Sequence, residues 1–166
     1  MVPDHTIRRA TTDDISAIQR IARKSWRGAY GDFIDDEDIE AMLAEGYSEG
    51  FLEKAITSTA MTLFVAEDGL SVVGFVSCEP PADGSVGGVS IYVSPDYWGE
   101  GLGSALLERA QEYLAAKGAT EMQDTVLDAN DVGNAFYGKH FDPVEETTVE
   151  MGDDEFEATV YRGELA

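Results

Sequence analysis

The segment from Val89 to Lys117 limits the folds open to this chain more than any other. An apolar, β-branched run ends at Ser94, and glycines follow at Gly99, Gly101 and Gly103 before an amphipathic helix begins without a break. This order predicts a strand, a glycine-rich turn and a helix. Because glycine lacks a Cβ, backbone N–H groups in such a turn can approach a ligand closely, next to the positive end of the helix dipole. We therefore expect the turn to hold phosphate oxygens.

The remaining segments predict a complete order of elements around this turn. The first helix is capped by Thr11 or Thr12, runs toward Trp26 and breaks up around Gly28 and Gly31. The strand that follows the long crossover helix should lie parallel to the strand before the turn, whereas the hairpin-connected strands are antiparallel. Expected strands cover 6–10, 62–67, 72–79, 87–94, 121–127, 144–151 and 156–161, and expected helices cover 11–26, 35–46, 51–56, 102–117 and 132–139. The predicted fold is α/β, with a mixed, mostly antiparallel sheet of six to seven strands flanked by helices.

Length and apolar content predict one globular domain over residues 1–166. Hydrophobic residues make up 43% of the 166 positions, which is enough for one core. No apolar run approaches the roughly 20 residues of a membrane span, and the N-terminus lacks the pattern of a signal peptide. We therefore expect a cytoplasmic protein without a membrane partner. The single cysteine, Cys78, lies in an apolar strand, so it is expected to be buried and unreactive.

Acidic residues outnumber basic ones by 33 to 11, which gives a formal net charge of −22. A field of this sign repels nucleic acid and anionic membranes, so neither is expected as a partner. The acids are spread along the chain, including the runs at 35–38 and 153–155. Such a spread suggests adaptation to a salt-rich cytoplasm, in which salt screens the self-repulsion. An acidic cleft for a polycationic substrate is a second explanation, and both can hold together.

Two common phosphate-binding loops fit this turn poorly. A P-loop requires a lysine directly after its glycines, and none is present here. The dinucleotide-binding fingerprint finds Gly99, Gly101 and an acid at Asp124, but its third glycine would fall on Ser104. That fold also begins with the glycine turn, whereas three hairpin-connected strands precede the turn in this chain. Neither of these two loop types is therefore favoured for this turn.

A third type of loop fits better, because residues 97–103 resemble motif A of the GCN5-related N-acetyltransferases, the GNAT family. Gly101 and Gly103 match its fixed positions, and Trp98 stands where arginine or glutamine is usual. Residues 130–141 resemble a second block of this family, which has an asparagine, an alanine, a tyrosine and a closing Gly-Phe. Asn130, Tyr137 and Phe141 match this block, whereas Gly133 and His140 replace the alanine and the glycine. The resemblance covers residues 6–162 and implies the family's mixed-sheet α/β fold.

This resemblance implies acetyl-CoA as cosubstrate, with its pyrophosphate held by backbone amides of the turn. A backbone N–H at the end of the preceding strand, from Tyr92 or Val93, is expected to stabilise the thioester oxygen. The residues assigned to the cofactor in this way are Tyr92, Val93, Trp98, Gly99, Glu100, Gly101, Leu102, Gly103, Ser104, Asn130 and Tyr137. Relatives often carry a cation at the position of Glu100, and Arg109 and Lys139 are the nearby cations of this chain.

The expected chemistry is acetyl transfer to an amine, which needs a proton donor and a proton acceptor. Tyr137 is the candidate donor to the leaving thiolate, with a purely packing role as the alternative. Many relatives use as base a glutamate early in the strand before the turn, where this chain has Gly87. Glu79 and Asp124 are therefore the candidate bases, unless they are ordinary solvated acids at strand ends or the amine arrives neutral.

Trp26 and Tyr30 lie where this family builds the wall of its acceptor site, although they could equally pack the segment on the core. With two histidines and one cysteine far apart, no metal site is expected. We thus expect an acetyl-CoA-dependent N-acetyltransferase that acts on a primary amine of a small molecule or peptide by direct attack in a ternary complex. The alternative is a non-catalytic acyl-CoA-binding or sensing module of the same fold. Members of the family often dimerise, so a homodimer is compatible with the resemblance.

Overall fold

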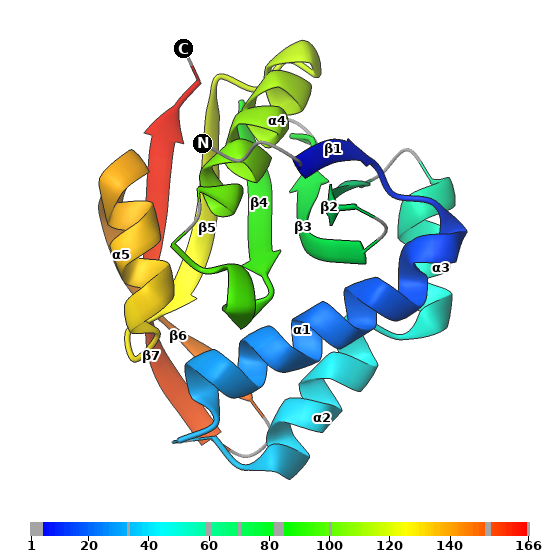
Figure 1. Ribbon diagram of the computed structural model, residues 1–166. Coiled ribbons are helices and arrows are strands. Elements are labelled where there is room, and N and C mark those ends of the chain that lie inside the picture. The colour runs from blue at the N-terminus through cyan, green and yellow to red at the C-terminus, as the bar shows by residue number, and fades with distance from the viewer. Residues whose placement is uncertain are drawn as a thin grey trace.

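A mixed sheet forms the centre of the protein (Figure 1). The computed structural model describes residues 5–32, 34–58, 61–69, 71–81, 85–99, 101–151 and 154–165. Within these residues, seven strands form one sheet in the order β1-β2-β3-β4-β5-β7-β6. The strands are β1 (His5–Arg9), β2 (Thr62–Asp68), β3 (Ser71–Glu79), β4 (Val86–Val93), β5 (Glu121–Leu127), β6 (Asp142–Met151) and β7 (Asp154–Glu164). The predicted fold class is confirmed.

Neighbouring strands are antiparallel except for β4 and β5, which are parallel as expected for strands joined by a crossover helix. Only the amino-terminal ends of β4 and β5 are paired, with residues 86–88 opposite residues 121–123. Beyond this point the two strands diverge, and Figure 1 shows the space between them widening toward the end of β4. Backbone groups along this gap are therefore not used by the sheet.

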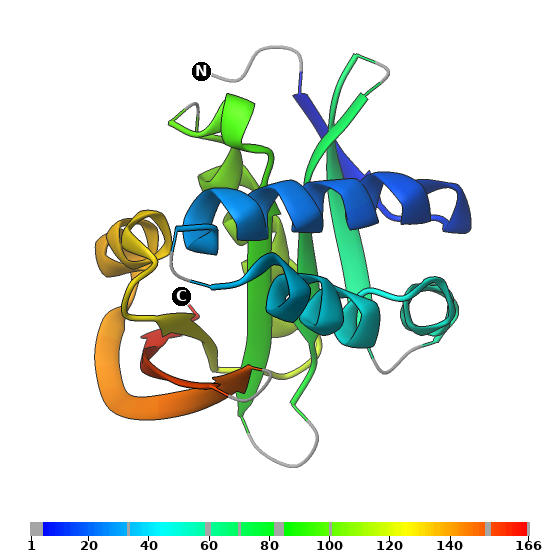
Figure 2. The same cartoon turned by 90° about the horizontal axis from the view of Figure 1, so that it is seen from below.

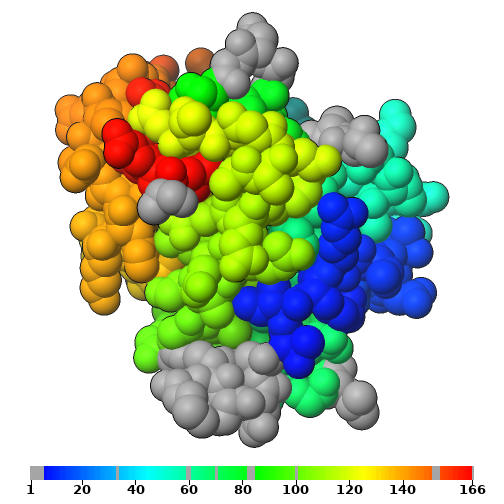
Figure 3. Space-filling model, turned by 90° about the horizontal axis from the view of Figure 1, so that it is seen from above, coloured from blue at the N-terminus to red at the C-terminus, as the bar shows by residue number. Residues whose placement is uncertain are grey.

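Helices cover both faces of the sheet. The helical elements are η1 (Thr12–Asp14), α1 (Ile15–Tyr30), α2 (Asp36–Gly46), α3 (Glu49–Thr57), η2 (Pro95–Tyr97), α4 (Leu102–Ala116) and α5 (Asp131–His140). Helices α1, α2 and α3 pack on one face, where α1 and α2 lie in front of the sheet in Figure 2. Helix α4 packs on the other face and crosses it between β1 and the last residues of the chain in Figure 3. Among the described residues, no helix is long and apolar enough to cross a membrane.

Helix α1 is longer than the sequence predicts, because it continues through Gly28 and ends at Tyr30. The prediction of a break at Gly28 was wrong for a reason of packing. A Cβ at this position would lie 3.3 Å from the Trp98 ring and 3.4 Å from the Pro95 ring. Glycine at this position thus allows α1 to pack closely against the segment that follows β4.

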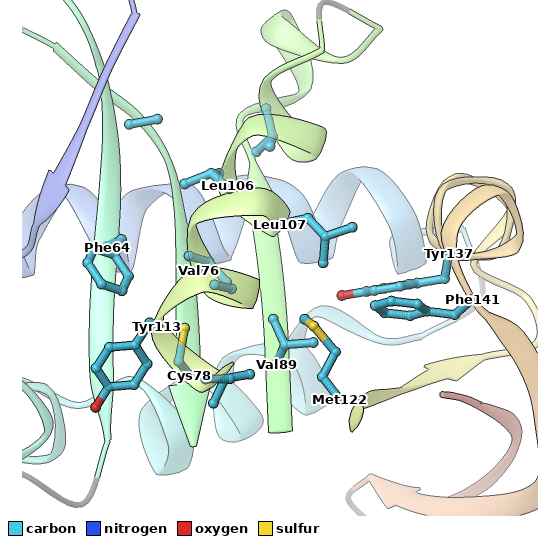
Figure 4. Packing of buried hydrophobic residues seen from close by; sticks show 14 of the residues in the cluster. Phe64, Val76, Cys78, Val89, Leu106, Leu107, Tyr113, Met122, Tyr137 and Phe141 are labelled. Carbon is cyan, nitrogen blue, oxygen red and sulfur yellow. The ribbon is translucent and has the colours of Figure 1, made fainter. Parts of the chain in front are cut away.

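The core between α4, α5 and the sheet reaches from Phe64 on β2 to Phe141 after α5 (Figure 4). Cys78 is fully buried in it, and this burial raises the pKa of the thiol to about 12. The expectation of a buried cysteine is therefore confirmed. Tyr137 extends from α5 toward β4 in Figure 4, stacked on Phe141 with ring centroids 5.7 Å apart. Packing of α5 against the sheet therefore determines where the Tyr137 hydroxyl lies.

Candidate active site

A cleft of about 500 Å³ lies between the glycine turn, the carboxyl end of β4 and helix α5. We call it the main cleft. The turn and the start of α4 contribute Tyr97, Trp98, Gly99, Gly101, Leu102, Gly103 and Ser104, and β4 contributes Ile91, Tyr92 and Val93. Asn130, Val132, Gly133, Ala135, Phe136, Tyr137, Lys139 and His140 line it around α5, and Ser25, Ala29 and Tyr30 line it from α1. Apart from Glu100, which lies outside the described residues, every residue assigned to the cofactor lines this cleft.

The start of α4 presents to the main cleft backbone donors that have no acceptor among the described residues. Gly99 and Gly101 have φ angles of 83° and 82°, in the left-handed region that favours glycine. The first hydrogen bond of α4 runs from the Ala105 N–H to the Gly101 carbonyl oxygen, at 3.1 Å. The three preceding amides, those of residues 102–104, therefore have no acceptor within the helix. This arrangement, with the positive end of the α4 dipole, suits an anionic group such as a pyrophosphate.

Trp98 has a different role from the other residues of the turn. Its backbone N–H donates to the Pro95 carbonyl oxygen at 3.2 Å, so this amide is already used. The indole Nε1–H donates to the Val93 carbonyl oxygen at 2.8 Å. Where arginine or glutamine is usual in the resembling family, this chain thus has a side chain that fastens the turn to the end of β4.

The backbone of Val93, rather than that of Tyr92, faces the gap between β4 and β5. The Ser94 N–H donates to the Val73 carbonyl oxygen on β3 at 2.8 Å, and successive amides of a strand point in opposite directions. The Val93 N–H therefore points away from β3. The carbonyl of Val93 is fixed by Trp98 and by the Ser25 hydroxyl, which donates to it at 3.1 Å. Two donors thus orient the peptide that precedes the turn.

Asp124 and Tyr137 meet at the inner end of the gap. Asp124 is the first residue of β5 beyond the segment paired with β4. Burial raises the pKa of its carboxyl group to about 7, although the neighbouring Tyr137 hydroxyl, the Thr125 N–H and the Ser90 hydroxyl oppose the shift. Residue Asp124 is nevertheless partly accessible to solvent. It can therefore exchange a proton near neutral pH.

The Tyr137 hydroxyl is buried, and among the described residues no hydrogen bond of good geometry reaches it. Burial raises the pKa of Tyr137 well above its ordinary value, and the Asp124 carboxyl adds to the shift. The backbone of Ile91 on β4 opposes it. An unpaired, protonated hydroxyl beside the β4–β5 gap is available to a ligand that enters the gap.

The other candidate base, Glu79, lies at the opposite end of β4. It is exposed and stands opposite Gly88, in the closed part of the sheet. Neither Glu79 nor Asp124 lines the main cleft itself, but Asp124 lies beside the Tyr137 hydroxyl, and Tyr137 does line it.

The absence of a glutamate at Gly87 has a steric explanation. A Cβ on Gly87 would lie 2.9 Å from Leu114 of α4 and 3.2 Å from the Glu79 carbonyl oxygen. Helix α4 thus packs directly on this position and leaves no room for a longer side chain.

The two predicted acceptor residues occupy different places. Tyr30 is buried, lines the main cleft and accepts a hydrogen bond from the Asn130 amide nitrogen at 3.0 Å. Asn130 also caps α5, because its Oδ1 accepts from the Gly133 N–H at 2.9 Å. Trp26 does not line the main cleft but contacts Tyr30 edge-to-face, with ring centroids 5.0 Å apart. The side chain of Asn130 thus joins α5 to α1.

Sequence reasoning missed Tyr47, which follows α2. Its ring lies 6.0 Å from that of Tyr92, whose side chain the sequence analysis had not considered. Burial is the main cause that raises the pKa of Tyr47 to about 12, and the Asp124 carboxyl adds to the shift. The sequence signal for Tyr47 was weak, because a single aromatic residue after a helix end is more often part of the core.

The cations near the main cleft also differ from expectation. Lys139 lines it, whereas the half-exposed Arg109 on α4 does not line it and lies over the Phe64 ring at 4.4 Å. His140, noted in the sequence only as a replacement for glycine, also lines the main cleft. Its Nε2 lies 3.4 Å from the Ser104 Oγ.

Comparisons with known proteins identify the family. A model of the acetyltransferase (GNAT) family matches residues 16–142, which is most of the chain. A spermidine N(1)-acetyltransferase from Thermoplasma acidophilum is 28% identical over 145 residues, covering 85% of this chain and 89% of that protein. An uncharacterised N-acetyltransferase from Bacillus subtilis is 31% identical over 130 residues, covering 75% of this chain and 73% of that protein.

Solved structures share the fold. The PaiA N-acetyltransferase from Thermoplasma acidophilum, in complex with coenzyme A, superposes with a TM-score of 0.80 at 23% identity, covering 96% of this chain and 98% of that one. A Salmonella typhimurium protein solved with its cofactor acetyl-CoA gives a TM-score of 0.69 at 23% identity, covering 98% and 95%. The family match over residues 16–142 shows that this chain belongs to the GNAT family of acetyltransferases, enzymes that take the acetyl group from acetyl-CoA.

Proposed function

We propose that the protein transfers the acetyl group of acetyl-CoA to a primary amine of a small molecule or peptide, by direct attack while both substrates are bound. One observation carries this proposal. Val93 and Tyr137 line the main cleft next to the glycine turn, and the Asp124 carboxyl lies beside the Tyr137 hydroxyl where β4 and β5 separate.

The residues present fit coenzyme A. The amides at the start of α4, which have no acceptor within the helix, and the basic side chains of Lys139 and His140 suit its phosphate groups. The orphaned hydroxyl of Tyr137 suits a polar group at the inner end of the main cleft. Bound there, acetyl-CoA would supply an activated thioester carbonyl.

Asp124 is the base in this proposal. An alkylamine with a pKa near 10 is only about one part in a thousand neutral at pH 7, so its proton must be removed before attack. A carboxyl with a pKa of about 7 can accept that proton at neutral pH, while an acid with an ordinary pKa is a weaker base. Burial of Asp124 beside the gap thus supports it over the exposed Glu79.

Val93 and Tyr137 would assist the remaining charge changes. As the amine nitrogen bonds to the carbonyl carbon, negative charge grows on the carbonyl oxygen, and the Val93 N–H can donate to it. As the carbon–sulfur bond breaks, the Tyr137 hydroxyl can donate its proton to sulfur, which otherwise leaves as a thiolate with a pKa near 8.5. The second amine proton then restores the tyrosine hydroxyl through solvent.

Aromatic residues near Asp124 support a cationic acceptor. Tyr47 and Tyr92 lie close to each other, and the Asp124 carboxyl adds to the raised pKa of both, behind burial as the main cause. Ring faces and a carboxylate attract an alkylammonium group. The relative from Thermoplasma acidophilum is named for spermidine, a cationic amine, and the net charge of −22 would concentrate cations around the protein. The same charge also fits adaptation to a salt-rich cytoplasm.

Thiol release from acetyl-CoA tests the proposal. We expect release that depends on an added amine from a panel of polyamines, alkylamines, amino acids and peptides, in dilute buffer and in molar KCl. Initial rates at varied concentrations of both substrates should give intersecting lines, as a ternary complex requires. Parallel lines would contradict direct attack, and coenzyme A binding without release for any amine would favour a sensing module.

A further inference from the structure

The turn that faces the phosphates lacks the basic residue that resembling proteins often carry there, since position 100 is glutamate. In a protein with a net charge of −22, coenzyme A with its several negative charges meets a repulsive field. Backbone amides of the turn are partial charges only. A full positive charge near the turn would therefore have a large effect on cofactor affinity.

Two basic side chains stand at the carboxyl end of α5, in the main cleft that the turn also lines. Lys139 and His140 form the last turn of α5 and both line the main cleft. The His140 ring packs on Phe136, with centroids 5.0 Å apart, and its Nε2 lies 3.4 Å from the hydroxyl of Ser104 at the start of α4. The negative end of the α5 dipole favours positive charge at this position.

The amino end of α4 and the carboxyl end of α5 therefore lie next to each other. The amino end of α4 offers N–H donors that have no acceptor within the helix, and the His140 ring at the carboxyl end of α5 lies 3.4 Å from the Ser104 hydroxyl at that end. Gly103 also lies against Phe136, where a Cβ would be 3.1 Å from the ring, so the two helices are closely packed here. A phosphate group bound at the turn would thus lie within reach of donors from both helices.

We propose that His140, together with Lys139, binds a phosphate group of coenzyme A and takes the place of the basic residue missing from the turn. This inference rests on the proposed function, because it requires coenzyme A in the main cleft. His140 stands where the resembling family has glycine, so this contact would be a property of this chain.

Direct binding of coenzyme A, measured by calorimetry, tests the inference without reference to turnover. In dilute buffer, His140→Gln should raise the Kd about threefold to tenfold, as expected for loss of one exposed charge-assisted contact. His140→Lys should keep or improve the native affinity, because it restores a cation at that place. Lys54→Gln on α3 is the matched control, since it removes one exposed positive charge away from the main cleft and should leave the Kd unchanged.

Cofactor fragments show which phosphate is bound. If His140 contacts the pyrophosphate, the effect of His140→Gln should persist with 3′-dephospho-coenzyme A. If it contacts the 3′-phosphate, the effect should vanish with that ligand. In both cases the effect should be absent with pantetheine, which carries no phosphate, and should shrink in molar KCl.

An equal loss of affinity for pantetheine, or an unchanged Kd for coenzyme A in a folded His140→Gln protein, would overturn the inference. The circular dichroism spectrum and the melting temperature of each variant report folding. Failure of the native protein to bind coenzyme A would instead defeat the proposed function itself. The two failures are thus distinguishable.

Discussion

The two ends of β4 differ in their residues and in what they pair with. At its amino end, Gly87 and Gly88 pair with β5, Gly88 also pairs with β3, and α4 covers Gly87 directly. At its carboxyl end, Val93 pairs with β3 alone, and its other side faces the gap. Pairing with β5 thus closes the amino end of β4, whereas its carboxyl end stays open to the gap. Whether an acid can take part in the reaction depends on whether it lies beside the paired segment or beside the gap.

Glu79 and Asp124 show what this difference means. Glu79 stands beside the closed end, exposed to water, whereas Asp124 stands where the gap begins and its pKa is raised to about 7. Two carboxyl groups that look alike in the sequence thus stand in different surroundings, and burial raises the pKa of Asp124.

Replacing the two acids in turn should separate them most strongly. Asp124→Asn should lower kcat/KM for the amine about 100-fold or more, because general bases commonly contribute about 10² to 10⁴ in rate. Glu79→Gln is the matched control and should remain within about twofold of the native enzyme. Rates measured for both variants at pH 7.5 test this, and a larger loss in Glu79→Gln would reverse the assignment.

The pH dependence of the same reaction provides a second check on Asp124. Since its pKa is raised to about 7, the group is protonated and inactive as a base below that pH. The native kcat/KM should therefore rise about tenfold per pH unit below 7 and level off above it. In Asp124→Asn, this rise of kcat/KM with pH should be missing. An unchanged rise would show that another group titrates.

Tyr137→Phe tests the hydroxyl that faces the open end of β4. Removal of the proton donor to sulfur should lower kcat about tenfold to 100-fold. Because the ring still packs on Phe141, binding of coenzyme A should change little. Calorimetry and steady-state rates measure the two effects separately, and equal losses of affinity and rate would point to a packing role alone.

A substitution at the paired amino end of β4 should change the stability of the protein rather than its catalytic rate. Gly87→Ala places a Cβ 2.9 Å from Leu114 and should destabilise the fold by about 1–3 kcal/mol, as overpacking does. Gly88→Ala is the matched control, because its Cβ would meet Glu79 at an ordinary 3.5 Å. Urea unfolding of both proteins compares them, and equal stabilities would show that α4 can shift to make room.

Much of this arrangement could be predicted from local patterns. The glycine turn was placed because alternate glycines between a β-branched run and an amphipathic helix are typical of one geometry, and Gly99 and Gly101 do have positive φ. The parallel β4–β5 pair followed from the crossover helix. Both predictions rest on rules about consecutive segments of the chain, which do not depend on contacts with distant residues.

Features that depend on contacts distant in sequence could not be predicted in this way. Gly28 looked like a helix breaker, but its neighbour is Trp98, 70 residues away. The raised pKa of Asp124 depends on where β4 and β5 part, which no motif records. Tyr47 does not line the main cleft, and it contacts Tyr92, which does, only because α2 brings it there.

A change of salt concentration should have the smallest effect, which is measured on coenzyme A binding. It tests whether the net charge of the whole protein or the local charge at the site dominates this binding. The net charge of −22 repels coenzyme A over distances that molar KCl screens, while Lys139 in the main cleft attracts it locally. With 33 acids against 11 basic residues, the repulsion is the larger effect. The affinity for coenzyme A should therefore hold or improve by up to a few fold between dilute buffer and molar KCl. Calorimetric titration at both salt concentrations decides this, because a marked loss of affinity in KCl would show that the local cations outweigh the acidic surface.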